Sequence, residues 1–257
     1  MRDVKKMKTS LIQGDYKLFE GRYNAQMPKL VQEGLQPLTA KDLMQYKLQA
    51  IQGKDKDEID FWLKQYFATV DGLAYHDNKL IVVPNSQELL NINPDSKLSN
   101  GSLILTPETP EQFKQLSKKY KIIKRSKIAS GKSLTKKQAK EHPIWQKLAQ
   151  EDKSLLNEYV DAIFAKAKEV YNYDENMGIY LPNDQDKPVM RDWYLWDLDN
   201  NSFWRSVADA RHELGVNCRL LGVRAQNLEE VLGKVAVKGK LTNPNELEKA
   251  IKLYKTI

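Results

Sequence analysis

Positive charge is concentrated in one short stretch of the chain. Eleven basic residues and no acidic residue lie between Lys114 and Lys140. The whole chain carries 41 Lys and Arg against 34 Asp and Glu, a net charge of +7, so this stretch holds all of the excess. Such a concentration attracts polyanions, and nucleic acid first among them. We name nine of these residues the basic stripe and expect them to contact nucleic acid or another polyanion: Lys118, Lys119, Lys121, Lys124, Arg125, Lys127, Lys132, Lys136 and Lys137.

The basic stripe contains few rings on which bases could stack. Single-strand binders combine cations with aromatic side chains, but only Tyr120 lies inside the stripe. Two alternatives are a solvated face and a surface that docks an acidic protein. The run Ser130-Gly131-Lys132-Ser133 invites comparison with a phosphate loop, but Ser126 stands where that loop needs its first glycine. We therefore expect no nucleotide site there.

A second candidate site combines aromatic rings with carboxylates. Three of the five tryptophans fall between residues 193 and 204, close to several aspartates. Such a mixture can line the pocket of an enzyme or small-ligand binder. The residues of this hypothesis are Trp193, Trp196, Asp197 and Asp199. The alternative is a strand that packs its rings into the core on both faces.

Chemistry that needs a metal, a cofactor or a catalytic motif is not indicated. The run from Asp197 to Asn201 begins like a calcium loop, but the twelfth position is Ala208 instead of a bidentate glutamate. The three histidines, at 76, 142 and 212, have no metal-binding spacing. No nucleophile motif is present either. The sequence therefore favours a noncatalytic protein with no metal and no cofactor.

The hydrophobic pattern predicts both helices and strands. Helical spacing of apolar residues, or capping residues before them, predicts helices near 39–53, 59–67, 111–118, 135–148, 155–171 and 202–215. Short apolar runs bounded by turn residues predict strands near 73–75, 80–83, 102–105, 177–181, 190–198 and 217–224. Residues 10–23 read as a hairpin followed by a loop around Pro28 and Pro37, and two short helices are expected near 227–233 and 244–254. The fold class is α+β, with mixed or antiparallel sheet elements, packed helices and a more helical second half.

The bulk properties limit the location and the number of domains. A chain of 257 residues suits one large domain or two small ones, and we place the boundary at 130, between 1–130 and 131–257. Cys218 has no partner for a disulfide and lies among apolar residues, which predicts a buried, inert strand thiol. No run of residues is long and apolar enough for a membrane span. We expect a cytoplasmic binding protein that uses the basic stripe; its oligomeric state is not indicated.

Overall fold

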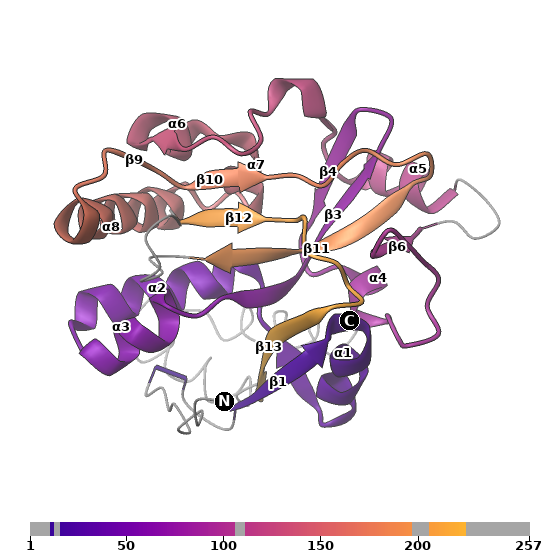
Figure 1. The fold of residues 1–257 in the computed structure, drawn as a ribbon, viewed down its shortest axis with the longest axis horizontal. Helices are drawn as coiled ribbons and strands as arrows, with labels where there is room; N and C mark the ends of the chain where they lie inside the picture. Colours follow the sequence, from indigo (N-terminus) through magenta and orange to yellow (C-terminus); the bar gives the residue numbers. More distant parts are fainter. Residues whose placement is uncertain (1–10, 13–15, 106–110, 197–205, 225–257) are drawn as a thin grey trace, which may run out of the picture.

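The computed structural model describes residues 11–12, 16–105, 111–196 and 206–224, and it combines one large sheet with helices (Figure 1). Its strands are β1 (Tyr16–Arg22), β2 (Leu35–Pro37), β3 (Phe67–His76), β4 (Lys79–Val83), β5 (Leu98–Ser99), β6 (Ser102–Ile104), β7 (Ile123–Lys124), β8 (Leu134–Thr135), β9 (Glu175–Asn176), β10 (Gly178–Tyr180), β11 (Val189–Trp196), β12 (Val207–Asp209) and β13 (Asn217–Arg224). Its helices are α1 (Tyr23–Gln32), α2 (Ala40–Gly53), α3 (Lys56–Leu63), α4 (Gln87–Leu90), α5 (Glu111–Lys119), α6 (Lys136–Glu141), α7 (Pro143–Leu148) and α8 (Lys153–Tyr171), with a 3-10 turn at Arg125–Lys127.

The large sheet is mixed. Its main path runs β1-β13-β3-β11-β12-β10, and β2, β4, β5, β6 and β7 join it at the sides. β10 runs parallel to β12, and β13 runs parallel to β3, whereas the other neighbours are antiparallel. β8 and β9 form a separate two-stranded sheet. The α+β class with a mixed sheet is therefore confirmed, and the large sheet takes strands from both sides of residue 130.

Helices cover both faces of the large sheet (Figure 1). On one face, α2, α3, α7 and α8 pack on strand residues such as Leu73 and Trp193. On the other, α1, α4 and α5 pack on residues such as Ala74 and Tyr194. Neighbours along a strand thus enter different cores, because successive side chains point to opposite faces. The sheet is the rigid middle layer from which the connecting loops project.

An irregularity in the centre of the sheet is fixed by side chains. The pairing of β11 with β3 shifts register between Asp192 and Tyr194. Opposite this shift, the Asp71 carboxylate accepts hydrogen bonds from the backbone N–H groups of Ala40 and Asn85, at 2.6 and 2.8 Å. Burial raises the pKa of Asp71 to about 7. The irregularity is thereby tied to the start of α2 and to the segment that follows β4.

Several local predictions are confirmed by the structure. Thr39 with Asp42 and Thr135 with Gln138 form complete capping boxes at the starts of α2 and α6. The long apolar pattern becomes α8, which ends at Asn172 in a left-handed conformation. β11 and β13 also occupy the predicted segments. Cys218 is a buried strand thiol, as predicted, and burial raises its pKa to about 12.

Three local predictions are wrong. In place of the hairpin expected at 10–23, residues 16–22 form the single strand β1, which pairs with β13. Pro28 lies inside α1 and not in a loop. Tyr23, Met27 and Leu30 are buried at helical spacing, and that burial outweighs the missing proline N–H. Part of the helix expected at 202–215 is instead the short strand β12.

The two helices expected after residue 226 lie outside the described residues. None of the described helices is long and apolar enough to cross a membrane.

Candidate binding surface

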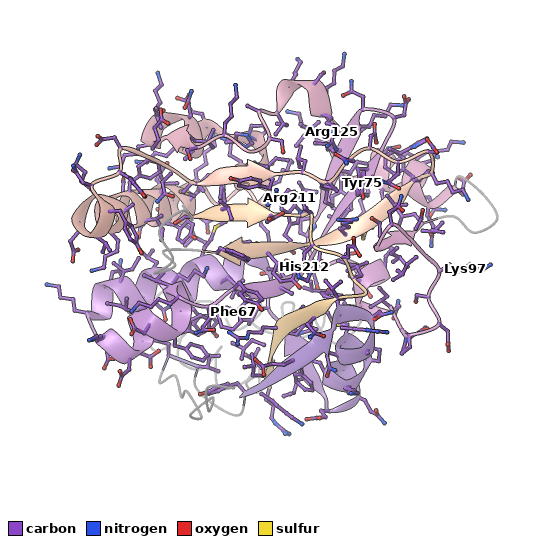
Figure 2. The ribbon with its side chains drawn as sticks, in the orientation of Figure 1. Phe67, Tyr75, Lys97, Arg125, Arg211 and His212 are labelled. Atoms are coloured by element: carbon purple, nitrogen blue, oxygen red, sulfur yellow. The ribbon has the colours of Figure 1, made fainter. Side chains whose placement is uncertain are left out.

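Four connections that are far apart in the sequence meet near one end of β11. They are the β3–β4 turn at 77–78, the β5–β6 turn at 99–101, the β10–β11 loop at 182–188 and residues 210–213 of the β12–β13 loop. We call these residues the loop platform. Figure 2 labels Tyr75 and Arg125 beside it and Arg211 and His212 within it. Loops on a rigid scaffold are where binding residues concentrate in folded domains.

The side chain of Arg191 holds two of these loops in place through hydrogen bonds. Its side chain projects from β11 and is only 6% exposed. The guanidinium donates hydrogen bonds to the carbonyl oxygens of Asn100 and Arg211, and its Nε donates to Ser102 Oγ at 2.7 Å. Tyr75 completes the cluster, since its hydroxyl lies 2.8 Å from the same Ser102 oxygen. A buried cation binds its acceptors strongly, so this cluster holds the two loops in one geometry.

Further hydrogen bonds join the remaining loops. The backbone N–H of Asn78 donates to Asp184 Oδ2 at 2.9 Å, which links the β3–β4 turn to the β10–β11 loop. Asn100 Nδ2 donates to Gln185 Oε1 at 2.8 Å, which links that loop to the β5–β6 turn. The N–H of Leu214 donates to the Gly101 carbonyl at 2.8 Å. Each of the four loops is therefore bonded to at least one other.

The β5–β6 turn requires a glycine at its second corner. Asn100 and Gly101 have φ angles of 47° and 71°, as in the tight hairpin turns that Asn-Gly sequences favour. A Cβ atom on Gly101 would lie 2.3 Å from the side chain of Glu213. The absence of a side chain at 101 thus allows the turn to lie against the β12–β13 loop.

Arg211 of the loop platform packs on Tyr180, the last residue of the neighbouring strand β10, and the two form an ordered pair of side chains suited to binding. The Arg211 guanidinium lies 4.1 Å from the centre of the Tyr180 ring and donates to both oxygens of Asp209, at 2.8 Å for its shortest contact. These contacts with the carboxylate of Asp209 raise the pKa of Arg211. The Arg211 side chain is still 46% exposed. Tyrosine and arginine dominate binding energy in many interfaces, and here the pair is already ordered.

Beneath the platform, β11 carries two ionisable groups whose pKa values are raised by burial. Neither carboxylate oxygen of Asp192 has a hydrogen-bond partner among the described residues, and burial raises its pKa well above the ordinary value. Burial likewise raises the pKa of Tyr194, which neighbours Cys218. The Tyr194 ring in turn lies 4.3 Å, centre to centre, from the ring of His212. The β12–β13 loop is therefore supported by the Tyr194 ring beneath His212 and by the Arg191 guanidinium beneath the Arg211 carbonyl.

Comparison with known proteins identifies the fold. No protein-family model matches the chain, and no curated protein matches it either. A solved structure from work on the accommodation of massive sequence variation in Nanoarchaeota by the C-type lectin fold is similar, with a TM-score of 0.61. The fold is C-type lectin-like. The match covers 84% of this chain and all of the nanoarchaeal chain at 18% sequence identity, so the C-type lectin-like likeness concerns the fold alone.

The expectation that this protein binds nucleic acid is wrong. The C-type lectin-like fold lends no support to a nucleic-acid site. The structure also uses part of the positive charge internally. Lys136 and Lys140 both pair with Asp161, at 2.9 and 2.8 Å, and Arg125 donates to the carbonyl of Pro182. The ammonium of Lys119 lies 5.1 Å from the Tyr120 ring, the only ring of the stripe.

The structure distributes the basic stripe over several elements. Lys118 and Lys119 end α5, Lys121 follows it, and Lys124 lies in β7 opposite Lys79 of β4. The others lie on the 3-10 turn, before β8 and on the first turn of α6: Arg125, Lys127, Lys132, Lys136 and Lys137. Apart from the half-buried Arg125 these residues are exposed. The stripe is a solvated surface beside the loop platform.

The two described tryptophans of the proposed ligand pocket face different cores. Trp193 is fully buried in the core that includes α2 and α8. Trp196 is half-buried on the opposite face, where its ring lies 5.4 Å from that of Tyr66. This arrangement follows from the odd spacing of the two residues along β11. Asp197 and Asp199, the acids of that hypothesis, lie outside the described residues.

Sequence analysis did not find the platform residues. The Asn100-Gly101 dipeptide is a strong hairpin signal and could have located the β5–β6 turn. Nothing local marks Arg191, Tyr180 or Arg211, because only the pairing of β10 and β11 with β12 brings these residues together. Within the described part of the chain no three His, Cys, Asp or Glu side chains form a group that could hold a metal ion.

Proposed function

We propose that this protein is a binding module that recognises a protein partner through the loop platform, with Tyr180 and Arg211 at the centre of the contact. One observation carries this proposal. The buried cation of Arg191 bonds loops on either side of it, and an exposed arginine and a tyrosine lie ordered above. A surface ordered before binding loses little conformational entropy when a partner arrives.

The similarity in fold supports the proposal by analogy. The work on the nanoarchaeal structure concerns how its C-type lectin fold accommodates massive sequence variation. Loops that are held by a rigid sheet can change their exposed side chains at little cost to stability. We infer that the exposed loop residues of this chain likewise determine which partner is bound, whereas β11 and Arg191 hold the loops in place.

The loop platform carries charges of both signs. Its exposed acids are Asp77, Asp184, Asp186 and Glu213, and its exposed cations are Arg211 and Lys187. A protein with a complementary arrangement of charges would associate faster than one without it. The single buried thiol, Cys218, suits a reducing compartment, and we propose the cytoplasm as the site of action.

Photo-crosslinking at the platform captures the partner and so tests the proposal. Benzoylphenylalanine replaces Tyr180 in the full chain, which is expressed in its own cells and irradiated. The control carries the same residue at Lys56, which is exposed on α3 at a distance from the platform (Figure 1). Crosslinked proteins are identified by mass spectrometry, and one that is captured only from position 180 is purified.

The affinity of that protein is then measured for the wild type, Arg211→Glu and Lys56→Glu. Reversal of charge at Arg211 is expected to weaken binding at least tenfold, an effect of about 1.4 kcal/mol or more. Lys56→Glu makes the same change of charge outside the platform and is expected to leave affinity within twofold. Equal capture from both positions, or unchanged affinity of Arg211→Glu, contradicts the proposed function.

A further inference from the structure

His212 occupies a position from which it can control the loop platform. It follows Arg211 in the β12–β13 loop, and its ring lies 4.3 Å from the Tyr194 ring at an interplanar angle of 35°. Its Nδ1 is buried and has no hydrogen-bond partner among the described residues. The imidazole is therefore held by ring packing and not by a hydrogen bond at Nδ1.

The loop around His212 is attached at points on either side of it. Before it, the Arg211 carbonyl accepts from Arg191, and the Arg211 N–H donates to Asp209 Oδ1 at 2.8 Å. After it, Leu214 donates to the Gly101 carbonyl and accepts from the N–H of Asn24 at 3.2 Å. Between these attachments the Tyr194 ring is the surface on which His212 rests. Displacement of the imidazole would remove this support from the segment between the two attachments.

The surroundings of His212 oppose a positive charge on it. Burial lowers the pKa of His212, and the cation of Arg191 on β11 lowers it further. Asp209 on β12 and Glu213 in the same loop act in the opposite direction, but burial is the largest effect. Burial also raises the pKa values of Tyr194 and Asp192, which lie on β11.

We propose that His212 is an acid-sensitive latch for the loop platform, which releases residues 210–213 from Tyr194 when its imidazole is protonated. The latch would regulate the surface of the proposed function. Its effect on partner binding therefore rests on that proposed function. A folded state that disfavours protonated histidine loses stability as the pH falls below the unfolded pKa of about 6.5. Movement of the loop away from Tyr194 would expose the protonated imidazole to water and so reduce this loss of stability. Acid thus displaces Arg211 and weakens the surface that it forms with Tyr180.

An NMR titration of the full chain from pH 7.5 to 5.0 tests the latch without any ligand. The His212 ring signal is assigned by comparison with His212→Phe, which keeps an aromatic ring against Tyr194 and cannot be protonated. In the wild type the backbone amides of Arg211, Glu213 and Leu214 are expected to shift together with the His212 ring. In His212→Phe these three amides are expected to change by less than a third as much.

Two results would overturn the latch. Titration of the His212 ring with no accompanying change at the three amides would show that protonation does not move the loop. Equal amide shifts in His212→Phe would assign them to another group. Neither result depends on a partner, so failure of the latch is distinct from failure of the proposed function, which is decided by Arg211→Glu at pH 7.5.

Discussion

At the scale of single residues, Arg191 is the residue on which the platform depends. Replacement by Met keeps much of the side-chain volume but removes every donor. The carbonyls of Asn100 and Arg211 and the hydroxyl of Ser102 then lose the bonds of a buried cation. We expect Arg191→Met to lower the free energy of unfolding by about 2–4 kcal/mol. Urea denaturation measures this free energy of unfolding, with the exposed Lys56→Met as control. A decrease of less than about 1 kcal/mol in Arg191→Met would show that the loops do not need Arg191.

Asp192 provides a prediction about pH. Its folded-state pKa is raised, so the native protein holds a proton that the unfolded chain releases above a pH of about 4. Wild-type stability therefore falls as the pH rises from there toward the folded-state pKa, by up to about 1.4 kcal/mol per pH unit. Asp192→Asn is neutral throughout and should gain stability relative to the wild type between pH 4 and 7. Urea denaturation at pH 4 and at pH 7 measures this gain in stability. If the unfolding free energies of the two proteins changed with pH in parallel, the raised pKa of Asp192 would be contradicted.

At the scale of elements, helix starts are defined by local chemistry. Thr39 caps α2 and forms a reciprocal pair with Asp42, so Thr39→Ala should cost about 1 kcal/mol of unfolding free energy. Gln49, exposed on the same helix, is the matched control, and Gln49→Ala should change stability by less than about 0.5 kcal/mol. Thermal unfolding by circular dichroism compares the two. Equal effects would mean that the cap contributes nothing beyond the helix propensity of alanine.

Sequence patterns located elements when the signal lay within the element. Both capping boxes and the long apolar face of α8 could be read directly. β12 could not be read, since a three-residue strand is defined by β10 and β11 on either side of it. The loop platform could not be predicted from the sequence for the same reason. Arg191 and Arg211 are twenty residues apart, and only the pairing of strands joins them. Long-range pairing is the information that a single sequence does not display.

At the scale of the whole molecule, the sheet makes the two halves of the chain interdependent. β3 pairs with β11 and β13, and both cores contain residues from before and after position 130. We expect one cooperative unfolding transition for the described fold. Trp62, Trp145 and Trp193 are fully buried and report tertiary structure, whereas far-ultraviolet circular dichroism reports the helices. Transitions in urea that differ between the two signals would indicate halves that unfold separately.

In this C-type lectin-like fold, four connections of one mixed sheet lie close together near one end of β11. These connections form the loop platform on which the proposed function rests. The basic stripe, which lies within the segment that holds the excess of positive charge, meets this platform where Arg125 donates to the carbonyl of Pro182. Charge alone pointed to nucleic acid, and the C-type lectin-like fold lends no support to that interpretation.

The affinity of the crosslinked partner for the wild type and for Arg211→Glu at pH 7.5 tests the central claim most directly. If the loop platform is the binding surface, the variant binds at least tenfold more weakly while Lys56→Glu binds like the wild type, and all three proteins unfold at similar urea concentrations. If Arg211→Glu binds as tightly as the wild type, the partner is held elsewhere and the platform is not the functional site.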